Sequence, residues 1–169
     1  MLQHVIIATC SEIQLVSNMR YCFDDFKTDI NKLIDDVNGG DAAYDYIVGI
    51  VRGGSIPASC LSYHLGLPMR NVSWSTYHQD QMKESAMDIA EDILAGKKLL
   101  IVDDILDSGR TMKELIEDWG VDRSQFDLAV LIWNEGQDLV PDYYGRKINR
   151  ADDTEWITFW WEDINGYTK

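Results

Sequence analysis

The residues in this chain whose types and spacing best suit chemistry are three aspartates. Asp103, Asp104 and Asp107 follow a short apolar run and lead into a small-residue turn at 108–111, Ser-Gly-Arg-Thr. Helical spacing of apolar residues resumes at 112–119, so a helix is expected directly behind the turn. Free backbone N–H groups and the helix dipole at that point favour a phosphate. The pattern predicts a strand with an acidic end, followed by an anion-binding loop.

A second candidate ligand loop is the tripeptide Arg52-Gly53-Gly54, which follows a continuous apolar run at 46–51. The glycines let the backbone approach a ligand, and the Arg52 guanidinium is a forked cation suited to phosphate oxygens. An isolated Arg-Gly-Gly is more often an ordinary tight turn. Its occurrence in the same chain as the acidic motif favours the ligand-binding interpretation.

These loops need elements that position them, and the hydrophobic pattern predicts an α/β domain. Apolar runs predict buried parallel strands at 46–51, 67–73, 99–102 and 126–133. Helices are expected from residue 18 to the stop at Gly39 and Gly40, after Pro57, and at 112–119. Residues 83–94 fit either a short helix or part of a hairpin, and 3–16 fit a hairpin or two edge segments. In such a sheet, ligands bind at the carboxyl ends of the strands, where both loops lie.

Composition limits the function classes. The 169 residues suffice for one domain with a real core, and the apolar share of 46% is typical of a folded protein. A formal charge of −14 argues against nucleic-acid partners. Three cysteines without a CxxC pair imply neither a disulfide framework nor a zinc site. No apolar run approaches membrane-spanning length and no basic leader is seen, which predicts a cytoplasmic protein without a membrane partner.

Two stretches of the chain resemble a known family. Residues 97–111, KKLLIVDDILDSGRT, resemble the ribose-phosphate signature of type I phosphoribosyltransferases, most closely the xanthine-guanine and hypoxanthine-guanine branch. Residues 50–80 resemble the pyrophosphate-loop region of the xanthine-guanine enzymes. The resemblance implies one domain over 1–169, with a mostly parallel central sheet flanked by helices. It also implies a small hood built from about 1–17 and 134–169, and a homo-oligomer, either a dimer or a tetramer.

The implied reaction transfers 5-phosphoribose from phosphoribosyl pyrophosphate (PRPP) to a free purine base, with Mg²⁺ as cofactor and pyrophosphate as the second product. By resemblance, Asp103 and Asp104 hold the ribose hydroxyls, and Asp107 accepts the proton of the base. The implied 5-phosphate site is Asp107, Ser108, Gly109, Arg110 and Thr111, and the implied pyrophosphate site is Arg52, Gly53 and Gly54. The implied lid is Ser75, Thr76 and Tyr77, and the implied base contacts are Trp133, Asn134, Trp156 and Ile157. The implied metal ligands are Asp103, Asp104, Glu162 and Asp163.

The sequence also departs from the family pattern. Purine enzymes of this branch usually carry a lysine at the end of the 126–133 strand, where this chain has Trp133 or Asn134. The resemblance implies hypoxanthine, guanine or xanthine as the acceptor base, and the missing lysine leaves two alternatives. The protein could use a pyrimidine or nonstandard base, or it could be a non-catalytic regulator that senses PRPP. In this family the peptide bond that enters the pyrophosphate loop is often cis, so the Val51–Arg52 bond is a candidate cis peptide.

Overall fold

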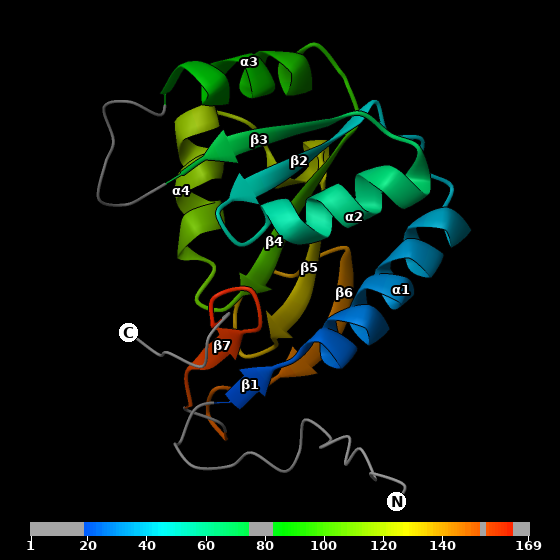
Figure 1. Ribbon diagram of the computed structural model, residues 1–169. Coiled ribbons are helices and arrows are strands. Elements are labelled where there is room, and N and C mark those ends of the chain that lie inside the picture. Colours follow the sequence, from blue (N-terminus) through cyan, green and yellow to red (C-terminus); the bar gives the residue numbers. More distant parts are fainter. Residues whose placement is uncertain (1–18, 75–82, 153–154, 164–169) are drawn as a thin grey trace, which may run out of the picture.

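A computed structural model describes residues 19–74, 83–152 and 155–163 (Figure 1). Its centre is a five-stranded sheet with the order β3-β2-β4-β5-β6, in which every pairing is parallel. The strands are β2 (Tyr46–Val51), β3 (Met69–Ser73), β4 (Leu99–Leu106), β5 (Asp127–Asn134) and β6 (Tyr143–Ile148). The four strands expected from apolar runs are confirmed as β2 to β5. β4 continues four residues beyond its predicted end and includes the first two aspartates.

Helices cover both faces of this sheet (Figure 1). One face packs on α1 (Phe23–Gly39) and α2 (Ser55–Leu65), and we call it the α1–α2 face. The other packs on α3 (Lys83–Leu94) and α4 (Arg110–Trp119), and we call it the α3–α4 face. A short 3-10 turn, η2 (Arg123–Gln125), leads into β5. The stretch at 83–94 is thus a helix, the first of the two forms that its sequence allowed.

The long first helix begins later than its sequence pattern indicated. The helix expected from residue 18 includes Met19, but this residue lies in a short strand, β1 (Met19–Tyr21), because the segment pairs with β7 (Ile157–Phe159). The helix begins after Cys22, whose backbone N–H donates to the Asp25 carboxylate at 2.9 Å. Local spacing could not reveal β1, because its partner strand is distant in the sequence.

β1 and β7 form a separate two-stranded parallel sheet. Aromatic rings of both ends of the chain pack on it: Tyr21 lies edge-on to Phe159, and Phe159 stacks on Trp161 with ring centroids 4.6 Å apart. The part of the predicted hood at 1–17 lies outside the described residues.

The segment Tyr143–Ile148 was not expected to be a strand of the main sheet, because the resemblance implied that 134–169 belong to the hood. It is the edge strand β6 of the main sheet, parallel to β5. Gly145 permits the close packing, because a Cβ there would lie 2.5 Å from the Asp29 Cβ and 2.6 Å from the Leu131 carbonyl oxygen. Arg146 then reaches the buried Asp29 carboxylate at 2.6 Å. The strand lacks an apolar run because its side chains make these polar contacts.

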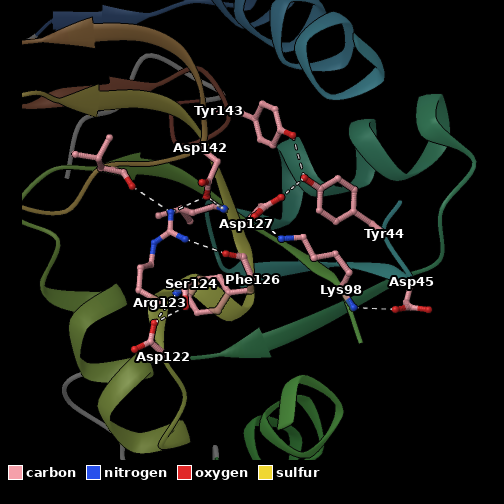
Figure 2. A network of polar contacts seen from close by, with 12 residues as sticks. Tyr44, Asp45, Lys98, Asp122, Arg123, Ser124, Phe126, Asp127, Asp142 and Tyr143 are labelled. Carbon is pink, nitrogen blue, oxygen red and sulfur yellow. Dashed lines mark hydrogen bonds and ion pairs between the residues drawn. The ribbon is translucent and has the colours of Figure 1, made fainter. Parts of the chain in front are cut away.

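Polar groups at the amino ends of the strands pair with one another, as Figure 2 shows. Lys98 lies 2.6 Å from one oxygen of Asp127, and the Tyr44 hydroxyl donates to the other at 2.5 Å. The Tyr44 oxygen is also 3.0 Å from that of Tyr143, and Arg123 binds Asp142 at 2.6 Å. These contacts tie together the starts of β2, β4, β5 and β6. In the described ranges, no helix combines the length and apolar character needed to cross a membrane.

Candidate active site

The two candidate loops meet at the point where the strand order changes direction. After β2 the chain adds β3 on one side, and it then returns to add β4, β5 and β6 on the other. Crossovers on either side of such a point diverge and leave a crevice at the carboxyl ends of the two central strands. Residues 52–54 follow β2, and Asp103 and Asp104 end β4, so both motifs border this crevice.

The loop after β2 lies against the acidic end of β4 without room for a side chain. A Cβ on Gly53 would lie 1.7 Å from an Asp104 carboxylate oxygen. A Cβ on Gly54 would lie 2.5 Å from the Val102 carbonyl oxygen and 2.8 Å from the Asp103 Cα. The Val51–Arg52 peptide is cis, as the resemblance had suggested. The exposed Arg52 guanidinium makes no ion pair with the residues described.

The acidic end of β4 interrupts the regular alternation of the strand. Before it, Ile101 packs on the α3–α4 face and Val102 on the α1–α2 face. After it, Ile105 packs on the α1–α2 face and Leu106 on the α3–α4 face, so the phase shifts by one residue. Irregularities of this kind re-aim side chains beside functional sites. Here the shift falls on Asp103 and Asp104.

Asp103 and Asp104 are half-buried carboxyl groups without a cationic partner in the described part of the chain. Asp103 accepts from the Asp104 backbone N–H, and Asp104 accepts from that of Ile105, each at 2.9 Å. Burial and the Asp104 charge raise the pKa of Asp103 well above its usual range. Burial also raises the pKa of Asp104, with a further contribution from the charge of Glu162. The pair is therefore suited to a ligand that supplies positive charge or hydroxyl donors.

The turn after these acids opens the N-terminus of α4. Gly109 has a φ of 70°, which favours glycine, and as the N-cap residue it has no side chain that could cap the helix. The Ser108 hydroxyl oxygen accepts from the Arg110 N–H at 3.3 Å. The first N–H groups of a helix have no partner within it, so the loop retains donors for an anion. Arg110 is 2.6 Å from Glu114, which also accepts from the Trp74 indole N–H at 3.3 Å.

Asp107 is held by residues from the two strands beyond β4. Asn134, the last residue of β5, donates its side-chain amide to the Asp107 carboxylate and to the Asp107 carbonyl oxygen, each at 3.2 Å. Arg150, two residues after β6, places Nε 3.1 Å from the same carboxylate oxygen. The sequence interpretation missed Arg150, because only the unpredicted strand β6 brings it to this edge. Its position in a polar stretch gave no signal.

The aromatic candidates lie in different environments. Trp156 precedes β7 and is 69% exposed, whereas Ile157 is buried within that strand. Trp133 is buried in the core on the α3–α4 face, and its ring lies 5.2 Å from that of Tyr144. This burial leaves the Trp133 ring little surface for a ligand. Trp156 offers an open aromatic face.

The remaining predicted site residues lie at the edges of the crevice or outside the described ranges. Glu162 follows β7, and its charge contributes to the raised pKa of Asp104. Asp163 instead forms an ion pair with Arg20. Among the described residues, no group of three or more histidines, cysteines or acids is arranged to hold a metal. The candidate lid residues Ser75, Thr76 and Tyr77 lie outside the described ranges.

Comparison with known proteins agrees with this geometry. The model of the phosphoribosyl transferase domain matches residues 23–162. A xanthine-guanine phosphoribosyltransferase of Idiomarina loihiensis is 31% identical over 123 residues, which are 70% of this chain and 71% of that protein. The corresponding enzyme of Cereibacter sphaeroides is 32% identical over 126 residues, 72% of this chain and 71% of the relative.

Solved structures give the same result. The crystal structure of a purine phosphoribosyltransferase from Pyrococcus horikoshii matches with a TM-score of 0.66 and 25% identity, covering 91% of this chain and all of the other. A xanthine-guanine-hypoxanthine phosphoribosyltransferase of Helicobacter pylori matches with a TM-score of 0.65 and 22% identity, over 88% of this chain and 97% of the other, and supports the fold. The match of the domain model and the identity to the two bacterial enzymes show that this chain belongs to the phosphoribosyltransferase family.

Proposed function

We propose that this protein transfers 5-phosphoribose from PRPP to a ring nitrogen of a 6-oxopurine, which is hypoxanthine, guanine or xanthine, and releases pyrophosphate. The observation that carries the proposal is the contact between the loop after β2 and the acidic end of β4, where Gly53 has no room for a Cβ beside Asp104. This contact brings the loop expected to bind pyrophosphate next to the two acids expected to bind the ribose. The xanthine-guanine activity named for the two bacterial relatives supports a purine as acceptor.

The proposed substrate lies along the carboxyl edge of β2 and β4. The 5-phosphate binds the loop at Ser108, Gly109, Arg110 and Thr111, where α4 begins without a side-chain cap. The ribose hydroxyls donate to Asp103 and Asp104. The pyrophosphate binds the backbone at Gly53 and Gly54 and the Arg52 guanidinium.

In the reaction, the bond between the ring nitrogen and the anomeric carbon forms as the bond from that carbon to pyrophosphate breaks. The electron pair of the broken bond leaves with pyrophosphate. Carboxylates beside the sugar stabilise its oxocarbenium character. As it attacks, the base loses a proton from its five-membered ring to Asp107, which Asn134 and Arg150 hold in place.

The donor set fits Mg²⁺, which prefers oxygen ligands and usually binds one or two carboxylates together with substrate oxygens and water. Asp103 and Asp104 would hold it, and the bound ion would neutralise charge on the departing pyrophosphate. Glu162 lies close enough to raise the pKa of Asp104 and is a further candidate. Asp163 is a weaker candidate, because one of its oxygens is paired with Arg20.

The direct test incubates the purified protein with PRPP, Mg²⁺ and a panel of free purines and pyrimidines, and follows pyrophosphate release and nucleotide formation. We expect turnover with one or more 6-oxopurines. Turnover with a pyrimidine alone would replace the purine assignment. PRPP binding without turnover on any base would instead favour a PRPP-sensing regulator.

We expect the affinity for PRPP, at saturating Mg²⁺, to fall as the solution becomes more acidic. The pKa values of Asp103 and Asp104 are raised. In the free protein these carboxyl groups therefore become protonated at a higher pH than an ordinary aspartate, whose pKa is about 4. Binding requires the ionised pair and therefore releases protons. Affinity then weakens by up to about tenfold per pH unit for each proton released.

Isothermal titration calorimetry in two buffers with different ionisation enthalpies measures this proton release. Asp104→Asn should reduce it. The absence of proton exchange at any pH from about 5 to 8 would contradict the electrostatic argument.

A further inference from the structure

We propose that Arg150 is a specificity-determining residue whose guanidinium binds an exocyclic oxygen on the edge of the purine. This inference rests on the proposed function and assigns to a residue after β6 the discrimination between oxo and amino bases. Arg150 contacts both Asp107 and the segment that carries Trp156.

Three neighbouring strands deliver the residues concerned to one point. Asp107 follows β4, Asn134 ends β5, and Arg150 follows β6. The Arg150 side chain is 19% exposed, binds Asp107 through Nε at 3.1 Å, and donates through Nη1 to the Glu155 carbonyl oxygen. Since Glu155 immediately precedes the exposed Trp156, Arg150 links the proton acceptor to the candidate base platform.

Asn134 is poorly placed to read the base itself. The residue is 2% exposed, and its amide nitrogen is directed to Asp107. Its amide oxygen accepts from the backbone N–H groups of Arg150 at 3.2 Å and Gly136 at 3.4 Å. Every polar group of this side chain is therefore used, which makes Asn134 a positioning residue for Asp107 and Arg150.

Arg150 retains hydrogen-bonding capacity at the same point. A guanidinium has five N–H donors and no acceptor. The Nη2 group makes no hydrogen bond with the residues that the structure describes. The candidate site has two other arginines. Arg52 lies in the pyrophosphate loop, and Arg110 binds Glu114. Arg150 is thus the cation in contact with Asp107.

A group that only donates hydrogen bonds discriminates between purines. An exocyclic oxygen accepts from the guanidinium, whereas an exocyclic amino group at the same place presents hydrogens to it. A site built around such a hydrogen bond rejects the analogue that cannot make it. We therefore expect a preference for 6-oxopurines over adenine that depends on Arg150.

The test compares wild type, Arg150→Met and Arg150→Lys with the control Lys27→Met. Lys27 is exposed on α1 and loosely paired with Asp24 at 3.9 Å, so the control removes one exposed positive charge without removing a contact to Asp107. The measurements are kcat and KM for guanine, hypoxanthine and adenine, KM for PRPP, and dissociation constants for guanosine and adenosine 5-monophosphates. Nucleotide binding provides a readout that does not depend on turnover.

We expect wild type and Lys27→Met to bind guanosine monophosphate more tightly than adenosine monophosphate. Arg150→Met should weaken guanosine monophosphate binding by roughly 10- to 100-fold, the loss expected for a charged hydrogen bond. Its affinity for adenosine monophosphate and its KM for PRPP should change by less than about threefold. Arg150→Lys should retain part of the preference, because it keeps a donor-only cation.

Equal weakening of both nucleotides by Arg150→Met would show a purely structural role and overturn the proposal. A wild type that does not distinguish the nucleotides, or binds neither, would overturn it as well. If the protein shows no turnover but binds guanosine monophosphate more tightly, and Arg150→Met removes that difference, the role of Arg150 is supported and the proposed function fails. Turnover with unchanged selectivity in Arg150→Met would support the function and reject the role of Arg150.

Discussion

Replacement of Asp107 by asparagine should lower kcat by about 100- to 10,000-fold, which is the usual contribution of a positioned acid or base. Asparagine has nearly the same shape as aspartate. The hydrogen bonds from Asn134 at 3.2 Å and from Arg150 at 3.1 Å both reach the same Asp107 oxygen, which an amide oxygen can replace. The variant should therefore keep the local structure and lose the capacity to accept a proton.

Steady-state kinetics with a 6-oxopurine, together with calorimetry of PRPP binding, separate these effects. PRPP affinity should stay within about threefold of wild type, because the 5-phosphate loop keeps its backbone donors. The control is Asp118→Asn, since Asp118 is exposed near the end of α4. Wild-type kcat in Asp107→Asn would remove Asp107 as the proton acceptor.

Replacement of Gly54 by alanine should be the most damaging change in the pyrophosphate loop. Its Cβ would lie 2.5 Å from the Val102 carbonyl oxygen, 2.7 Å from that of Ile50 and 2.8 Å from the Asp103 Cα. These atoms belong to the backbone of the central strands, so the loop must move away from β4. We expect a loss of about 1–3 kcal/mol of stability, which is typical of overpacking, and a loss of about 100-fold in kcat/KM.

Two other glycines provide matched comparisons. In Gly53→Ala, the three atoms nearest to the Cβ all belong to the Asp104 carboxylate, the first at 1.7 Å, so PRPP affinity should fall with little change in stability. Gly39, at the end of α1, has nothing within 4 Å of its Cβ position among the described residues, and Gly39→Ala should be neutral or slightly stabilising. Urea unfolding and PRPP titration measure both quantities. If Gly54→Ala resembled Gly39→Ala in both, the proposed loop packing would be wrong.

The strands that form the centre of the sheet were predictable because each is buried on both faces. Such strands appear in the sequence as continuous apolar runs, as β2 and β5 do. Their prediction therefore needs no information about distant residues. The glycine and acidic loops were also recognisable, because their residue types are unusual immediately after such strands. The approach of Gly53 to Asp104 could not be predicted, because it depends on the adjacency of β2 and β4.

The edge strand β6 had no comparable signal. Its Tyr143 hydroxyl lies 3.0 Å from that of Tyr44, and its Arg146 reaches Asp29 on α1. Each partner lies about a hundred residues away, so these polar residues resembled a solvated loop. Because β6 was not recognised, the return of the chain to the carboxyl edge at Arg150 was not recognised either.

The sequence by itself determined the α/β class, the two loops and the residue types available to bind a sugar phosphate, because strand burial and local spacing are properties of neighbouring residues. Only the tertiary structure decided which side chains surround Asp107. It buried Asn134 and Trp133, left Trp156 exposed and brought Arg150 to the Asp107 carboxylate. The physical reason is that strand order sets these contacts, and the pairing of β4, β5 and β6 joins residues that are 27 and 43 positions apart.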